Sequence, residues 1–218
     1  MVAAKSLLAT ALLALAASAL AAADNPTVRI SPAAQRRAVA SLLRQSDFGA
    51  GWQGGRTQSS ALETPNCPDF SPKQSDLVVE GHADARFTFA PGDVVLQQDV
   101  EVLASPAAVQ SDFARTLTTK FPACLAYQLD HSPTIVSASV SRVPFPPTGA
   151  VSAAYRATVV VHSTRVRGAL LSDFVYFGEG RVEYSFNVVA PLSARGQLSR
   201  FELALARILL KRAATGPA

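Results

Sequence analysis

The chain has 218 residues, of which 49% are hydrophobic and 17% charged, with a formal net charge of +4. This length suits one domain with a substantial core. The positive charge is mostly arginine, spread along the chain without a basic run, so the composition argues against a nucleic-acid-binding protein.

The N-terminal segment has the pattern of a secretory signal peptide. Lys5 is followed by an apolar run to Ala23, and alanines before Asp24 fit the small-residue cleavage rule. An uncleaved membrane anchor is the alternative, because the run approaches the length of a spanning helix. We expect residues 1–23 to be a signal peptide and residues 24–218 to form a single α+β exported domain. We place it outside the cell or at the exterior of the envelope, with no membrane span after cleavage.

Export bears on the two cysteines, Cys67 and Cys124. Outside the cytosol two cysteines usually pair, and only one intramolecular pairing exists here. A metal site or a redox pair would be the alternatives. The chain has no C-x-x-C sequence, however, and its three histidines match no zinc-ligand spacing. We therefore predict a structural disulfide, no metal and no cofactor.

The first predicted element after the signal peptide is a helix. It begins at Ser31, a good N-cap residue, with Pro32 at the first helical position. Trp52 is expected to fold back into the core. Residues 53–76 are polar and contain several prolines, so we predict a loop around Cys67.

Two strands are predicted next, at residues 85–90 and 94–103. In the second strand apolar residues alternate with Gln97, Asp99 and Glu101. This alternation is typical of a half-buried strand in an antiparallel sheet.

A second helix is predicted to begin at the Ser-Pro pair 105–106, with an apolar face that recurs every four residues as far as Phe121. Pro122 should end or kink this helix. A short further helical turn carries Cys124, so the predicted disulfide would hold this helix end beside the loop that precedes the sheet.

The rest of the chain predicts two strands, a β-hairpin and a final helix, at residues 134–143, 155–162, 169–189 and about 194–212. The hairpin turn is expected at Gly178, Glu179 and Gly180. The stretches 99–117 and 185–205 both have the order strand, proline, helix, which suggests an internal strand-helix duplication. Together the elements predict an α+β fold, an antiparallel β-sheet with helices packed on one face.

Common catalytic motifs are absent from the sequence, which has neither a G-x-S-x-G elbow nor an H-E-x-x-H pair. A hydrolase triad would have to be assembled by the fold from His82, His131 or His162. Asp99 and Glu101 share a strand face and could act as acid and base. A solvated strand face is the simpler interpretation of these two residues.

One polar face is the better candidate for binding. Arg156 and His162 alternate with apolar residues on one predicted strand, and Arg181, Glu183 and Asn187 do so on another. If the two strands share a sheet, these residues could bind a small polar ligand or a partner. Cross-strand ion pairing, which stabilises a sheet only slightly, is the alternative interpretation.

Several stretches resemble a known group of proteins. "QSDFGAGW", "VEVLASPAAVQSDFARTL" and "YFGEGRVEYSFNVV" are similar to actinobacterial exported sensor-like domains. This group includes the extracellular domain of PknH-type serine/threonine kinases and related lipoproteins. The resemblance implies an antiparallel sheet with packed helices and a ligand cleft. The chain departs from it in having one candidate disulfide instead of two, no kinase domain and no lipid-anchor cysteine, so no functional residue follows from it.

These observations favour a non-enzymatic exported domain that binds a small ligand or a cell-envelope component. An exported hydrolase with a non-sequential active site and a structural envelope protein are the alternatives. A deep cleft lined by Arg156 or Glu183 would favour ligand binding, whereas a filled sheet face would favour a structural role.

Overall fold

The computed structural model describes residues 24–58, 62, 64–162 and 167–215. The predicted signal peptide, residues 1–23, lies outside these described residues. In the described part of the chain, no helix combines the length and the hydropathy needed to cross a membrane.

An 8-stranded sheet forms the centre of the domain, in the order β1-β3-β4-β8-β7-β6-β5, with β2 also paired to β3. All neighbouring strands are antiparallel except β1 and β3, which are parallel. The strands are Thr27–Val28 (β1), Trp52–Arg56 (β2), Val78–Phe89 (β3), Val94–Leu103 (β4), Ile135–Val143 (β5), Val151–His162 (β6), Arg167–Glu179 (β7) and Val182–Pro191 (β8).

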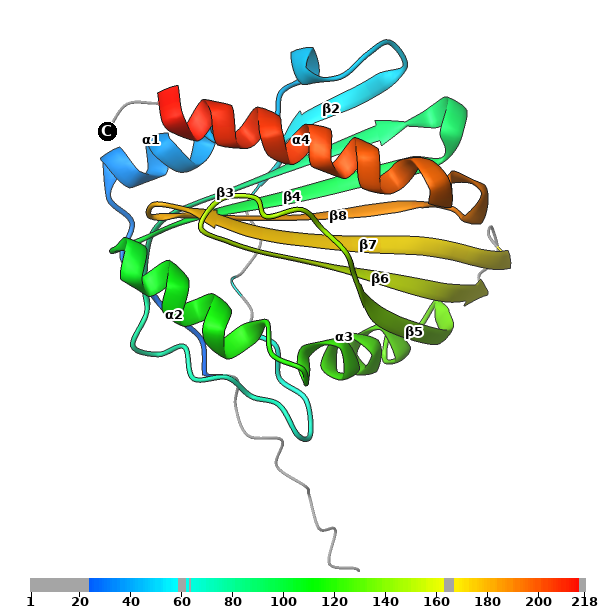
Figure 1. Cartoon of the computed structure of the whole chain (residues 1–218), viewed down its shortest axis with the longest axis horizontal. Coiled ribbons are helices and arrows are strands. Elements are labelled where there is room, and N and C mark those ends of the chain that lie inside the picture. The colour runs from blue at the N-terminus through cyan, green and yellow to red at the C-terminus, as the bar shows by residue number, and fades with distance from the viewer. Residues whose placement is uncertain (1–23, 59–61, 63, 163–166, 216–218) are drawn as a thin grey trace, which may run out of the picture.

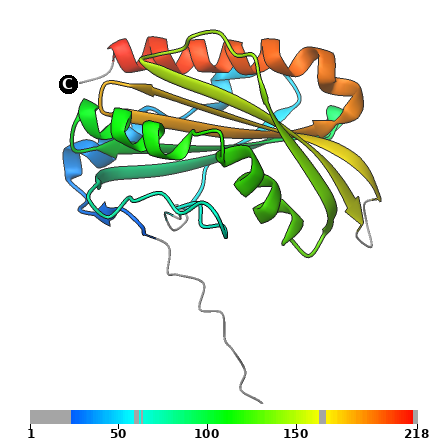
Figure 2. The same ribbon diagram turned by 60° about the horizontal axis from the view of Figure 1, so that its bottom comes forward.

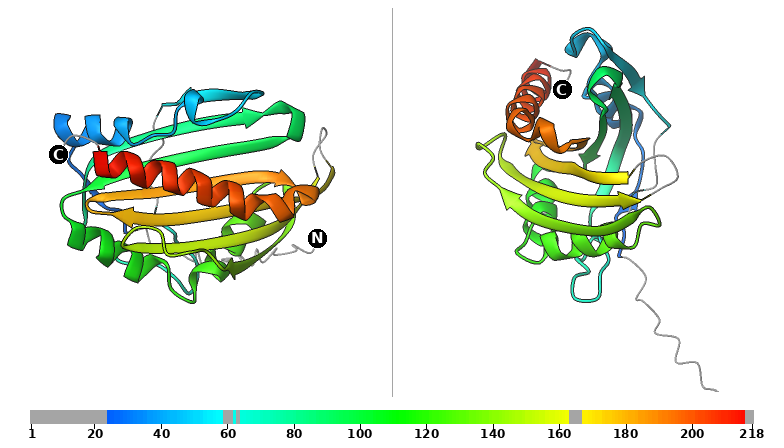
Figure 3. Two further views of the ribbon diagram at one scale, coloured as in Figure 1. Left: turned by 45° about the horizontal axis from the view of Figure 1, so that its top comes forward. Right: turned by 90° about the vertical axis from the view of Figure 1, so that its right-hand side faces the viewer.

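Within the described residues, four α-helices cover the sheet: Pro32–Ala40 (α1), Pro106–Thr116 (α2), Phe121–Asp130 (α3) and Arg195–Thr215 (α4). The predicted α+β class is confirmed. The sequence predicts helices on one face, whereas the structure has α1 and α4 on one face and α2 and α3 on the other (Figures 1 and 3). We call these the α1/α4 face and the α2/α3 face. The two strand-helix units, β4 with α2 and β8 with α4, thus end on opposite faces.

The α1/α4 face holds the larger core. Alternate residues of β4, including Leu96 and Val100, are fully buried there. They pack with the inward residues of β7 and β8, and with Leu205 and Leu209 of α4. The predicted caps are also present: the side chains of Ser31 and Ser105 accept hydrogen bonds from the backbone of the first helical turn. Local polar signals therefore fix where α1 and α2 begin.

Several strand predictions need correction. β3 begins at Val78, well before the predicted start at residue 85. β1 and β2 lie in segments without strand signals, and β2 occupies part of the predicted loop 53–76. Its sequence, "WQGGR", contains glycines that suit a close strand approach: at Gly54 an added Cβ would lie 2.1 Å from the carbonyl oxygen of Arg86. The hairpin turn is Gly180–Arg181, because Gly178 and Glu179 still pair with β8.

The predicted disulfide is confirmed. Cys67 and Cys124 are bonded, with their Cα atoms 5.5 Å apart, and both are buried. Cys124 lies in α3, and Cys67 lies in the segment that leads to β3. Figure 2 shows this segment beside α2 and α3. The bond therefore joins the helical cover of the α2/α3 face to the chain that enters the sheet.

Helix α2 lies very close to the sheet at Gly178. A Cβ at this position would be 2.5 Å from Cγ1 of Val109 and 3.0 Å from Cε2 of Phe113. We expect Gly178→Ala to lower the free energy of unfolding by about 1–3 kcal/mol, because the added methyl overpacks the contact. Denaturant unfolding measures the loss.

The matched control is Gly196→Ala in α4, where an added Cβ has no neighbour within 4 Å. Alanine is also the better helix former, so this variant should be as stable as the native protein or more so. Equal stability of Gly178→Ala and the native protein would contradict the close packing of α2.

Candidate functional site

Ionisable side chains are concentrated at the centre of the α2/α3 face. The strand register places Glu101 opposite both His82 and Glu183, and Asp99 opposite Asp84. Because alternate residues of a strand share a face, all five lie on the same side of the sheet. Like charges directly opposite one another destabilise a sheet. The fold therefore holds four carboxyls together on one side of the sheet.

A cavity of about 840 Å³ lies over these carboxyls. Asp99, Glu101 and Glu183 belong to its sheet side, and Asp112 lines it from α2. Its described lining residues include no lysine or arginine. The aromatic and apolar part of the lining comes mainly from α2, α3 and β7: Phe113, Leu117, Phe121, Leu125, Tyr127, Phe174 and Tyr176. A volume of this size is in the range of small-molecule sites in proteins.

A second cavity of about 520 Å³ adjoins the first along the sheet. The two share Asp99, Phe174, Tyr176 and Ser185, and the second extends to Asn187. The hollow on this face therefore continues across β4, β8 and β7.

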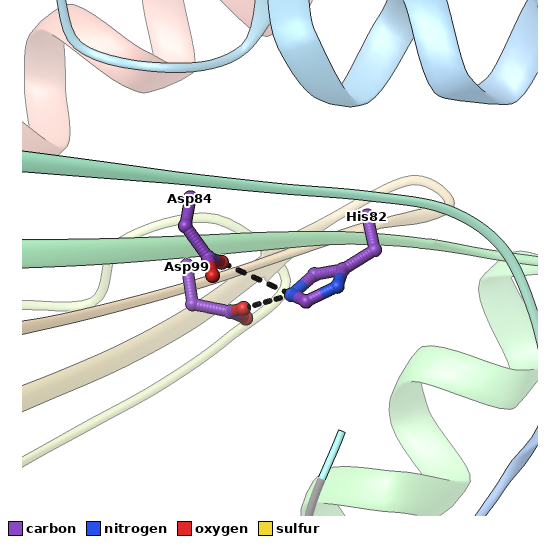
Figure 4. A group of neighbouring side chains, drawn as sticks. All are labelled: His82, Asp84 and Asp99. Carbon is purple, nitrogen blue, oxygen red and sulfur yellow. Dashed lines mark hydrogen bonds and ion pairs between the residues drawn. The ribbon is translucent and has the colours of Figure 1, made fainter. Parts of the chain in front are cut away.

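His82 contacts two carboxylates, Asp84 and Asp99 (Figure 4). Of these, Asp99 lines both cavities. The Nε2 atom of His82 is 2.5 Å from Oδ2 of Asp99 and 3.0 Å from Oδ1 of Asp84. Burial lowers the pKa of His82. The hydrogen bond to Asp99 and the charges of Asp99 and Asp84 raise it by more, so the net shift of this pKa is upward. The histidine is therefore protonated more readily than a free imidazole.

One ligand atom from each of His82, Asp84 and Asp99 lies within 4.8 Å of the others. A divalent metal accepts such a set of nitrogen and oxygen ligands. To bind it, Nε2 of His82 would first have to lose the proton that faces the two carboxylates. The geometry is that of an ion-paired histidine, and the absence of a functional metal stays a prediction.

Carboxyls of the cavity hold their protons unusually tightly. Burial, reinforced by the charge of Asp99, raises the pKa of Glu101 to about 8. Burial and the neighbouring Asp112 raise the pKa of Glu183 well above its usual range. Burial also raises the pKa of Asp99 to about 6, although His82 acts against this shift. At neutral pH Glu101 is therefore mostly protonated, and Glu183 ionises less readily than a free carboxyl.

Two buried oxygen atoms in the cavity wall have no hydrogen-bond partner in the described structure. They are Oε1 of Glu183, a residue only 8% exposed, and Oε1 of Gln74, 5% exposed. The orientation of Gln74 is set by its Nε2 atom, which donates to Asp112 and, at 2.9 Å, to Oγ1 of Thr116. A buried acceptor without a donor costs about 1–3 kcal/mol.

Of the five residues predicted to bind, the structure places two in these cavities. Glu183 lines the large cavity and Asn187 the smaller one. Nδ2 of Asn187 donates to Oγ of Ser172, at 2.8 Å, and to the backbone oxygen of Asp173. Their strand, β8, does share a sheet with β6, as the hypothesis required.

The other three predicted residues lie elsewhere. Arg156 pairs with Asp173, and Asp173 pairs with Val188, which belongs to the core of the α1/α4 face. Arg156 therefore lies on the α1/α4 face. His162 is exposed at the end of β6. Arg181, in the β7–β8 turn, pairs with Glu80, and its Nε donates to the backbone oxygen of Leu103. The five residues therefore do not form one site.

Residues of the cavity escaped prediction for different reasons. The sequence places Asp99 and Glu101 on one strand face, for which a solvated surface is the simpler interpretation. In the structure helices α2 and α3 cover that face, and both residues line the cavity. The alternation of His82 and Asp84 in "GHADARF" was a usable signal. Gln74 and Asp112 reach the site only through the packing of α2 against the segment before β3, and no local pattern marks them.

No protein-family model matches the chain, and no curated protein shows significant similarity to it. The resemblance to exported sensor-like domains therefore remains a hypothesis, and a function has to be argued from the cavity itself.

Proposed function

We propose that this protein is a non-enzymatic exported domain that binds a small ligand or envelope component in the cavity of the α2/α3 face. The observation that carries the proposal is the cavity of about 840 Å³ lined by the buried Glu183. A protein with only a structural role would fill this sheet face with side chains. Here the face combines a ligand-sized volume with carboxyls, and the described lining of the large cavity includes no lysine or arginine.

Export is part of the proposal. The N-terminal sequence has the signal-peptide pattern, and the Cys67–Cys124 bond is typical of proteins from oxidising compartments. The resemblance to exported sensor-like domains supports the same place of action, outside the cell or at the exterior of the envelope. The sensor-like role itself is inferred from that resemblance alone.

Ligand retention tests the proposal. Native mass spectrometry of the purified protein, followed by release of bound small molecules, should detect a ligand held in the cavity. Ser185→Phe should abolish this retention, because Ser185 lines both cavities and the larger side chain would occupy their shared volume.

The matched control is Ser141→Phe, the same substitution on the exposed surface of edge strand β5. It should retain the ligand as the native protein does. Equal loss from both variants, or no ligand on the native protein and no ligand binding in a fragment screen, would contradict a binding function.

A hydrolase is the second candidate, because the ion pair of His82 with Asp99 at the cavity edge is an arrangement that can support acid–base chemistry. We expect ester, peptide and glycoside substrates to be turned over at the buffer rate. Turnover that disappears in His82→Ala, but survives in the exposed-residue control His162→Ala, would instead favour an enzyme.

A further inference from the structure

We propose that the ligand of the large cavity is an organic cation, a protonated amine carried on a partly apolar body. The inference rests on the proposed ligand-binding function and adds the chemical class of the ligand.

The charge of the cavity wall is the first argument. Asp99 and Glu101 of β4 and Glu183 of β8 lie together on the sheet side, and Asp112 faces them from α2. Among the described lining residues, no lysine or arginine offsets these four acids, and His131 is the basic side chain present. An anionic ligand would be repelled here. A cation instead favours the ionised forms of these acids and is attracted by them.

Hydrogen bonding gives an independent argument. Oε1 of Glu183 and Oε1 of Gln74 are buried in the wall without a donor. Gln74 cannot turn to offer its amide nitrogen, because Nε2 already donates to Asp112 and Thr116. These two oxygens are therefore buried acceptors that a donor on the ligand would satisfy. An ammonium group is the complementary partner, since it has three donors and no acceptor.

The apolar part of the lining favours an organic cation over a hydrated metal ion. Phe113, Phe121 and Phe174 line the cavity together with Tyr176. Metal ions such as Ca²⁺ and Mg²⁺ prefer sites built from oxygen ligands and water. Aromatic faces, by contrast, attract alkylammonium groups and also bury a hydrocarbon body. A volume of about 840 Å³ leaves room for both parts of such a ligand.

Binding should be linked to proton release. Burial raises the pKa values of Glu101 and Glu183 above their usual range, so both carboxyls hold their protons to higher pH. A bound ammonium would favour their charged forms. The apparent affinity should therefore rise as the pH is raised from 6 to about 8, while a simple amine stays protonated because its pKa is about 10. The charged or titratable groups around Glu101 and Glu183, from all the packed elements, are His82, Asp84, Asp99, Asp112, Tyr127, His131 and Tyr176.

Isothermal titration calorimetry on the purified protein tests the inference with two matched sets of probes. One set is 2-phenylethylamine, 2-phenylethanol and 3-phenylpropionate, and the other is hexylamine, hexanol and hexanoate. In at least one set we expect the amine to bind ten times more tightly than the alcohol, and the carboxylate not to bind. The heat of amine binding should vary with the ionisation enthalpy of the buffer, because protons are released.

Glu183→Gln keeps the shape of the side chain and removes its charge, and it should weaken amine binding at least tenfold without changing alcohol binding. Asp112→Asn is a second variant with the same expected effect. The control is Glu179→Gln, an exposed carboxylate at the end of β7 outside the described lining. It should bind the amine as the native protein does. Thermal melts establish that each variant is folded.

The outcomes separate the two proposals. If alcohols or carboxylates bind as tightly as amines, or if Glu183→Gln and Asp112→Asn bind amines normally, the cation inference is overturned and the binding function stands. If no probe binds, the molecule retained by the native protein decides: a retained amine supports the inference, and a retained neutral or anionic molecule overturns it. If no probe binds and nothing is retained, the binding function falls and the cation inference falls with it.

Discussion

Asp173→Ala should lower the free energy of unfolding by about 3–5 kcal/mol, because it leaves a buried charge without its partner. Asp173 is almost fully buried beneath α4, and both of its carboxylate oxygens accept hydrogen bonds from Arg156. Only 13% of the Arg156 side chain is exposed. Truncation therefore leaves a mostly buried guanidinium beside Glu202, whose raised pKa keeps that carboxyl uncharged at neutral pH. Chemical denaturation at neutral pH measures the effect.

Two comparisons make this test specific. Asp76→Ala breaks an ion pair with Arg115 of similar geometry, but on the surface, and should change stability far less. The double substitution Arg156→Met with Asp173→Leu should recover much of the loss, because buried pairs are often replaced by apolar side chains without cost. A loss for Asp173→Ala no larger than that for Asp76→Ala would contradict the buried pair.

Alkaline pH probes the same cluster. Burial, with a hydrogen bond to Asp173, raises the pKa of Glu202 to about 9. A carboxyl whose folded-state pKa is raised contributes stability that is complete below its unfolded pKa of about 4.5 and is lost as the pH rises through the folded value. The native protein should therefore become less stable between pH 6 and pH 9. Glu202→Gln should reduce this slope. Glu101, Glu183 and His82 should contribute to what remains, since their pKa values are also raised.

Removal of the disulfide is the second large effect. Replacement of both Cys67 and Cys124 by alanine should lower the free energy of unfolding by about 4 kcal/mol, the value that chain entropy gives for a loop of this length. Alanine is the suitable replacement, because both positions are buried and a serine hydroxyl would need a partner. Denaturant unfolding of the oxidised native protein and of the double variant gives the difference.

Hydrogen exchange locates that loss. Amides of residues 64–76 and of α3 should exchange faster in the double variant, whereas β3, β4, β7 and β8 should keep their protection, because their cores do not depend on the bond. Native protein treated with a reductant is the control and should show the same local pattern. Uniformly faster exchange over the whole sheet would mean that the disulfide stabilises the entire fold. Unchanged exchange in α3 would mean that the disulfide does not stabilise this helix.

Local features of the fold could be predicted from the sequence because their causes are local. Ser31 and Ser105 mark helix starts by capping the backbone of the next residues, and the alternation in β4 marks which of its residues are buried. Strand β2 escaped prediction because its glycines carry no strand signal, and what holds it in place is the neighbouring strand β3.

The candidate site depends on strand order, which the sequence pattern does not contain. The alternation of polar and apolar residues predicts that Arg156 and Glu183 each lie on the polar face of their own strand. It does not tell whether two separate strands turn those faces to the same side. In the structure β7 lies between β6 and β8. The strand register places Arg156 on the face covered by α4 and Glu183 on the opposite face, where it lines the cavity. The meeting of Asp99 and Glu101 with Glu183 likewise follows from the pairing of β4 with β8.

That pairing also bears on how the domain folds. β1 to β4 are contiguous in the chain, as are β5 to β8, and the contact between β4 and β8 is where the two halves of the sheet join. Contacts between distant segments form more slowly than hairpins, since a long loop must close first. We therefore expect each half to form early and the seam between them late. The acids of the cavity lie on both sides of this seam, so the binding site is absent from either half alone and is completed only when the last major step of folding brings the carboxyls together.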